Sequence, residues 1–107
     1  MSWLEHHTLS EKYASQAEEL FRHQQIDRAT ELYCLAAETE TKALEDLDPS
    51  KTRTLGITAV SATSLYCKAR EFQQAKRIAY KWLATEFLPS FAVNELEGLL
   101  QVDRYKE

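Results

Sequence analysis

The 107-residue sequence predicts an all-α fold of five antiparallel helices. Apolar residues recur three and four positions apart in five segments, which is the spacing of an amphipathic helix. The chain holds only two glycines and two prolines, too few for the many tight turns of an all-β fold. A chain of this length forms one domain with one modest core, so we expect residues 1–107 to fold as a single unit.

The first helix is expected to begin near Thr8 or Ser10 and to end in the polar stretch 22–25. Thr8 and Glu11 have the spacing of a capping box, in which the hydroxyl accepts a backbone N–H and the glutamate reaches back. The apolar stripe that follows consists of Tyr13, Ala17, Leu20 and Phe21.

The second helix is expected over residues 26–47. Pro49 ends it, because proline disfavours helical backbone in the residue before it. Either Asp48 or Ser50 is then expected to cap the third helix.

The third helix is expected over residues 51–69, and its middle, residues 55–67, carries no charged side chain. A helix without a charged face is usually enclosed on several sides. We therefore expect this helix to lie at the centre of the domain.

The fourth helix is expected over residues 72–86 and the fifth over 91–101, with Pro89 breaking the chain between them. Residues 102–107 are expected to form a flexible tail. Short connections between all five helices predict antiparallel neighbours.

Two segments of the chain form a worn internal repeat. In the first, a small residue is followed by a large apolar pair and then by alternating large and small residues: Ala17, Leu20, Phe21, Ile26, Ala29, Tyr33 and Ala36. The second copy matches at Tyr66, Phe72 and Ala75, while Ala79 and Trp82 invert the expected order. Over residues 13–89 this pattern resembles the tetratricopeptide (TPR) repeat family, which implies a right-handed array of two helical hairpins with a C-terminal capping helix. Another five-helix bundle is the alternative.

The chain departs from the family's pattern in its turns and in its period. Gln24 and Arg70 stand where the family usually has glycine. Ala29 and Ala75 are 46 positions apart, against a usual period of about 34 residues. A Leu-Tyr-Cys triplet at 32–34 and again at 65–67 is out of phase with the repeat, and we interpret it as a coincidence.

The resemblance implies a concave groove that binds a peptide or a partner helix and is lined by the first helix of each hairpin. The positions that it assigns to the groove are Glu11, Ala14, Glu18, Phe21 and Arg22 in the first copy, and Ile57, Val60, Ser64, Cys67 and Lys68 in the second. Some members clamp a terminal carboxylate with asparagine and lysine, but Glu18 and Ser64 stand at the asparagine positions, so no such clamp is expected.

Two of these residues, Arg22 and Lys68, are candidates for pairing with an acidic partner. The alternative is that they are ordinary solvated charges at helix ends. Ile57 and Val60 are either groove contacts or core residues, since the helix that carries them is expected to be buried.

The charge balance excludes one class of partner. The chain carries 13 basic and 17 acidic side chains, whereas binding to nucleic acid requires clustered lysine and arginine. Residues 1–50 carry 4 basic and 11 acidic side chains, and residues 51–107 carry 9 and 6. The acidic segment 38–48 and the basic segment 68–81 are either solvated helix faces or a contact surface.

The two cysteines, Cys34 and Cys67, are expected to be buried free thiols in a cytoplasmic protein, because no signal peptide is visible at the start of the sequence. The longest uncharged stretch, 54–67, is too short and too polar to span a membrane. We therefore expect neither disulfide nor membrane partner.

No enzymatic activity, cofactor or metal is expected. The three histidines are His6, His7 and His23, and no pair of them has the spacing of zinc ligands on a helix. His6 and His7 are expected to be exposed to solvent. The sequence also lacks a Gly-rich phosphate loop and a Gly-x-Ser-x-Gly elbow.

The function expected from these observations is that of a small adaptor or scaffold module. The alternative is self-assembly into a homodimer through the ends of the array, near Trp3, Leu4, Phe91 and Leu100. In this reading Trp3 and Leu4 precede the first helix and either fold back as a staple or contact another chain. A helical bundle that binds a small molecule or catalyses a reaction is a third possibility, supported only by the versatility of such folds.

Overall fold

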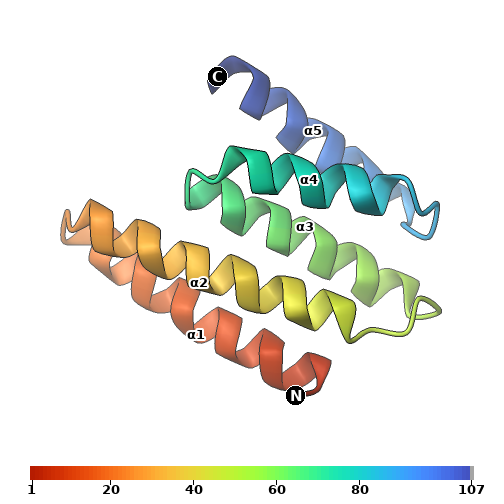
Figure 1. Ribbon diagram of the computed structural model, residues 1–107, viewed down its shortest axis with the longest axis horizontal. Helices are drawn as coiled ribbons and strands as arrows, with labels where there is room; N and C mark the ends of the chain where they lie inside the picture. The colour runs from red at the N-terminus through yellow and green to blue at the C-terminus, as the bar shows by residue number, and fades with distance from the viewer. Residues whose placement is uncertain (107) are drawn as a thin grey trace.

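A computed structural model describes the backbone of residues 1–106 and the side chains of residues 1–101 (Figure 1). The prediction of an all-α fold is confirmed, since the described residues form five helices and no strand. The helices are α1 (Trp3–Arg22), α2 (Ile26–Glu45), α3 (Thr52–Lys68), α4 (Phe72–Leu83) and α5 (Ser90–Lys106).

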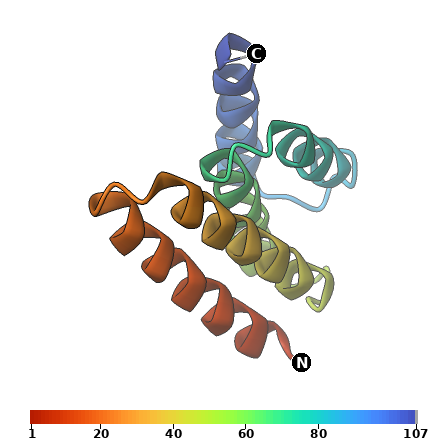
Figure 2. The ribbon, with the colours of Figure 1, turned by 60° about the vertical axis from the view of Figure 1, so that its left-hand side comes forward.

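Consecutive helices pack on one another, and the chain reverses direction at each connection (Figure 1). Figure 2 shows that α5 crosses α4 steeply instead of lying along it. The domain measures 40 × 35 × 18 Å, so it is broad and thin. Among the described helices, α3 packs extensively against three others, α2, α4 and α5. The expectation that α3 lies at the centre of the domain is therefore confirmed.

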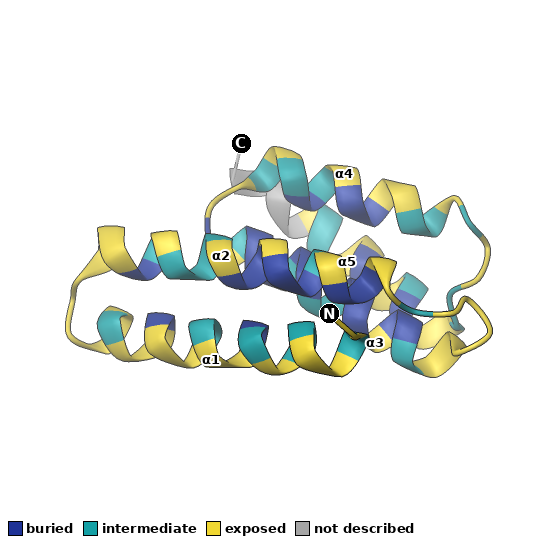
Figure 3. Cartoon of the chain, turned by 60° about the horizontal axis from the view of Figure 1, so that its bottom comes forward, coloured by how far each residue is buried: buried dark blue, intermediate teal, exposed yellow. Residues whose placement is uncertain are grey.

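Small side chains lie where the helices cross, because they let two backbones approach closely. The main core joins the α1–α2 hairpin to the α3–α4 hairpin, and most of its buried members are alanines; it contains Ala36, Ala37, Ala62, Leu65, Tyr66, Ala75 and Ile78. Figure 3 shows buried residues gathered along α2, while much of α1 is exposed to solvent. At Gly56 of α3 an added Cβ would lie 3.0 Å from Ala92 and Pro89, so α5 sits directly on this glycine.

The expected start of the first helix is wrong. α1 begins at Trp3, and its capping box is formed by Ser2 and Glu5, while Thr8 lies within the helix. The Ser2 hydroxyl accepts the Glu5 N–H at 3.2 Å, and the Glu5 carboxylate accepts the Ser2 N–H at 3.0 Å. The added turns are held in place by Trp3, whose indole Nε1 donates to Thr58 Oγ1 on α3 at 3.1 Å. Trp3 therefore does fold back onto the domain, but as part of α1.

The cap of α3 also differs from the expectation. The residue that caps α3 is Lys51, and its side chain makes no capping hydrogen bond. Asp48 instead accepts the backbone N–H of Ser50 at 3.0 Å, which closes a local turn before the helix. Asp48, one of the two residues that we expected to cap the helix, thus binds the backbone of the preceding turn instead.

The last two helices also end at positions other than those expected. α4 ends at Leu83 because the chain turns at Glu86, which has a φ of 62°. α5 runs to Lys106, five residues past the expected end at Gln101. The flexible tail at 102–107 stays a prediction, and its last residue, Glu107, lies outside the described residues.

Within residues 1–106, three residues other than glycine adopt the left-handed backbone conformation: Gln24, Arg70 and Glu86, with φ of 62°, 58° and 62°. Gln24 and Arg70 are the turn residues of the two hairpins, at the positions where the repeat pattern usually has glycine. An L-residue pays a steric cost in this conformation that glycine does not. The backbone of both turns therefore favours glycine, although Gln24 and Arg70 stand there instead.

None of the described helices combines the length and the apolar character needed to cross a membrane.

Candidate peptide-binding cleft

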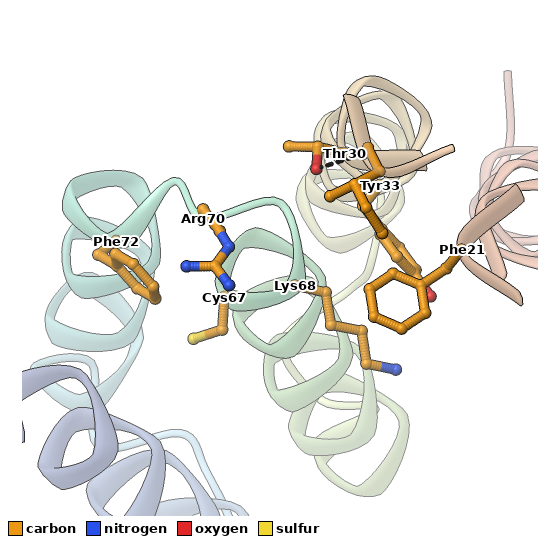
Figure 4. A pocket seen from close by; sticks show the side chains of 8 residues that line it. Phe21, Thr30, Tyr33, Cys67, Lys68, Arg70 and Phe72 are labelled. Atoms are coloured by element: carbon orange, nitrogen blue, oxygen red, sulfur yellow. Dashed lines mark hydrogen bonds between the residues drawn. The ribbon is translucent and has the colours of Figure 1, made fainter. Parts of the chain in front are cut away.

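A cleft of about 330 Å³ lies between the α1–α2 turn and the α3–α4 turn (Figure 4). We name it the aromatic–cationic cleft; its lining residues are Phe21, Ile26, Thr30, Tyr33, Cys67, Lys68, Arg70 and Phe72. Figure 4 shows Phe21, Tyr33 and Lys68 on one side and Arg70 and Phe72 on the other. The cleft therefore spans both hairpins.

The local fold explains why these residues meet. Phe21 lies in the last turn of α1 and Ile26 opens α2, so the left-handed residue Gln24 between them turns one towards the other. Arg70 has the same conformation between α3 and Phe72, the first residue of α4. The cleft is thus built from two hairpin turns placed next to each other by the packing of α2 on α3.

Large apolar side chains are exposed at this cleft. Phe21 is 56% exposed and Ile26 is 44% exposed, while Tyr33 and Phe72 are half-buried. Aromatic side chains that leave one face open are typical of surfaces that bind a partner.

The charged groups of the cleft are both cations. Lys68 Nζ lies 5.8 Å from the centre of the Tyr33 ring, which is the geometry of a cation–π contact. Neither Lys68 nor Arg70 forms a salt bridge with any residue in the described part of the chain. Burial and the nearby Glu18 carboxylate raise the pKa of the Tyr33 phenol, so Tyr33 stays neutral. The cleft therefore presents two available positive charges beside an apolar surface.

The structure brings three of the expected groove residues together in this cleft: Phe21, Cys67 and Lys68. The expected α3 positions Ile57, Val60 and Ser64 are not among its lining residues. Ile57 is 46% exposed and the other two are half-buried. The core alternative for Ile57 is therefore wrong.

The remaining expected positions lie on α1 and are not among the residues that line the cleft. Ala14 packs against the main core, and Glu18 is exposed. The Arg22 guanidinium pairs with Glu19 on its own helix, and Glu11 pairs with His7. Binding of a partner by these residues stays a prediction.

Sequence reasoning missed Arg70 as a site residue. The repeat pattern marks that position as a turn glycine, and an arginine there was interpreted only as a departure. The arginine in place of the turn glycine could have indicated a site residue, because a strained turn holds its side chain at a fixed point on the surface.

The expectation that His6 and His7 are exposed is wrong. His6 Nδ1 lies 2.6 Å from Asp46 Oδ2, and His7 Nδ1 lies 3.0 Å from Glu40 Oε1. The Trp3 ring stacks on the His7 ring at 4.8 Å. Both histidines thus join α1 to α2. We expected the first helix to begin after these two histidines, so neither of them was assigned to a packed helix face.

A second, smaller cleft of about 220 Å³ lies between α2 and the α3–α4 turn. We name it the acidic cleft; it is lined by Cys34, Glu38, Tyr66, Glu71 and Gln74. The Cys34 thiol donates to Glu38 at 3.9 Å. Burial, followed by the Glu38 and Glu71 carboxylates, raises the pKa of this thiol.

Neither cysteine forms a disulfide within the described residues, as expected, but both are half-buried and not buried. Each lines one of the two clefts, Cys67 the aromatic–cationic cleft and Cys34 the acidic cleft. Within the described residues, no group of three histidine, cysteine or carboxylate side chains is arranged to hold a metal ion.

No family model, no curated protein and no solved structure matches this chain. The TPR resemblance therefore stays a prediction, while the all-α architecture of helical hairpins rests on the structure itself.

Proposed function

We propose that this chain is a non-catalytic interaction module that binds a peptide segment of a partner protein in the aromatic–cationic cleft. The observation that carries the proposal is the combination of exposed apolar side chains with two cations that form no salt bridge within the described residues. A segment with one large apolar residue beside acidic residues complements this surface in shape and charge.

The lining residues contribute to binding in two ways, as apolar contacts and as positive charges. Phe21 and Ile26 offer open apolar area for the anchor of the partner. Lys68 is steered by the Tyr33 ring, and Arg70 supplies a planar guanidinium that binds carboxylates in a bidentate manner. The two half-buried cysteines, which form no disulfide within the described residues, agree with a reducing cytoplasmic setting, which is part of the same proposal.

The test is a set of synthetic peptides in which a Phe or Leu lies beside two Glu residues, compared with the same peptides carrying Gln. Binding is measured by fluorescence polarisation. We expect the acidic peptides to bind the wild type and to bind the Lys68→Glu/Arg70→Glu variant at least roughly tenfold more weakly.

The matched control is Arg53→Glu/Arg77→Glu, which makes the same change in net charge at exposed positions outside the cleft. This control should keep the wild-type affinity. Equal weakening by both variants would mean that net charge, and not the cleft, governs binding.

Self-association is the second candidate, since Leu4 on α1 and Phe91 on α5 are 62% and 42% exposed on the two outer helices. Analytical ultracentrifugation of the wild type and of Leu4→Ser/Phe91→Ser tests it. A concentration-dependent dimer that the variant loses supports this candidate, and a monomer at all concentrations removes it.

A further inference from the structure

The repeated Leu-Tyr-Cys triplet, which we interpreted from the sequence as a coincidence, connects the two clefts. One triplet lies on α2 and the other on α3, and these helices pack in antiparallel order. The aromatic–cationic cleft contains Tyr33 and Cys67, and the acidic cleft contains Cys34 and Tyr66. Each cleft therefore takes its tyrosine from one triplet and its cysteine from the other.

The two clefts lie on either side of the α3–α4 turn. Arg70 lines the aromatic–cationic cleft, and the next residue, Glu71, lines the acidic cleft. The Cα atoms of consecutive residues are about 3.8 Å apart. A segment that crosses this turn thus passes from one cleft to the other within a few residues.

The clefts differ in the sign of their charge. Lys68 and Arg70 are the cations of one, and Glu38 and Glu71 are the anions of the other. Among the residues that the structure describes, none of these four side chains forms a salt bridge. Burial, followed by the two carboxylates, raises the pKa of Cys34, which lines the acidic cleft beside them.

We propose that the partner segment is bipolar: it places acidic side chains in the aromatic–cationic cleft, crosses the α3–α4 turn, and places a lysine or arginine in the acidic cleft. This inference rests on the proposed function and adds the second charge of the partner. The two opposite charges also fix the direction in which the segment lies, because the reversed direction would bring like charges together.

The experiment extends the acidic peptide of the previous section with a Lys-Arg pair placed about three to eight residues from the glutamates. The acid-only peptide and a version with Gln-Gln in place of Lys-Arg are compared with it. At the best spacing we expect the bipolar peptide to bind the wild type roughly tenfold more tightly than either.

The variant Glu38→Lys/Glu71→Lys should abolish this gain while still binding the acid-only peptide. Its matched control is Glu31→Lys/Glu45→Lys, which changes two exposed carboxylates outside both clefts by the same charge. The control should keep the gain. Glu38→Gln/Glu71→Gln, which adds no positive charge, should also lose it, and thermal melts confirm that each variant is folded.

A bipolar peptide that binds no better than the acid-only peptide at every spacing would overturn the inference. So would a gain that survives Glu38→Lys/Glu71→Lys. In both cases binding of the acid-only peptide still supports the proposed function. Failure of the wild type to bind any of the peptides counts against the proposed function itself, so the two failures are distinguishable.

Discussion

The imidazole of His7 on α1 contacts the carboxylate of Glu40 on α2, with Nδ1 3.0 Å from Oε1 and 3.1 Å from Oε2. The Glu40 side chain is 1% exposed, whereas that of His7 is 25% exposed. The other ring nitrogen, Nε2, faces the carboxylate of Glu11. Since carboxylates only accept, both nitrogens donate together only when the imidazole is protonated.

Replacing His7 by alanine should destabilise the fold, because it leaves the buried Glu40 carboxylate without its partner. We expect a loss of about 3 kcal/mol in the free energy of unfolding. Urea denaturation followed by circular dichroism measures it. The control is His23→Ala: His23 pairs with Glu19 at an exposed position, so its loss should cost less than about 0.5 kcal/mol. Equal effects of the two substitutions would contradict the structural role of His7.

The two glycines should respond to alanine in opposite directions. At Gly56 an added Cβ would lie 3.0 Å from Ala92 and from the Pro89 ring, so α5 must shift, and we expect a loss of about 1–2 kcal/mol. At Gly98 nothing lies within 4 Å of an added Cβ. There the higher helix propensity of alanine should stabilise the protein by about 0.5–1 kcal/mol. A rise in Tm for Gly56→Ala would show that α5 does not pack on this glycine.

The turn residues allow stability and binding to be separated. Gln24→Gly and Arg70→Gly each place glycine at a left-handed φ, so each should raise the free energy of unfolding by roughly 0.5–1 kcal/mol. Only Arg70→Gly removes a cation from the aromatic–cationic cleft. It should therefore be a more stable protein that binds the acidic peptide more weakly, while Gln24→Gly keeps its affinity. Unchanged affinity of Arg70→Gly would remove Arg70 from the site.

The reactivity of Cys34 should report on the acidic cleft. Because burial and the two carboxylates raise the pKa of the thiol, the reactive thiolate is scarce at neutral pH and becomes abundant only above the ordinary range of cysteine. In a Cys67→Ser background, alkylation by iodoacetamide should be slow at neutral pH and rise steeply in alkali. Glu38→Gln/Glu71→Gln should shift this pH profile to lower pH. A profile that stays in place would show that the carboxylates do not act on the thiol.

The helices were predictable from the sequence because their apolar spacing is local information. The central position of α3 was predictable as well, because an uncharged helix such as residues 55–67 has no face suited to water. The start of α1 was not predictable with the same certainty, since Ser2–Glu5 and Thr8–Glu11 have the same capping spacing. The choice between them depends on Trp3 reaching Thr58, a contact across 55 residues.

The candidate site was predictable only in part. Phe21 and Lys68 follow from the repeat pattern, whereas Arg70 depends on which way a strained turn points its side chain. Arg70, Phe72 and Tyr33 line the same cleft because of how the two hairpins pack on each other. No local sequence pattern encodes that packing.

The aromatic–cationic cleft has a mechanical consequence, because its walls belong to different hairpins. α1 packs chiefly on α2, and the Trp3–Thr58 hydrogen bond ties its first turn directly to α3. Amide protons of α1 should therefore exchange with solvent sooner than those of α3, which three helices cover. A segment held between Phe21 and Arg70 would fasten the hairpins together and slow that exchange along the whole of α1, including turns that it never touches.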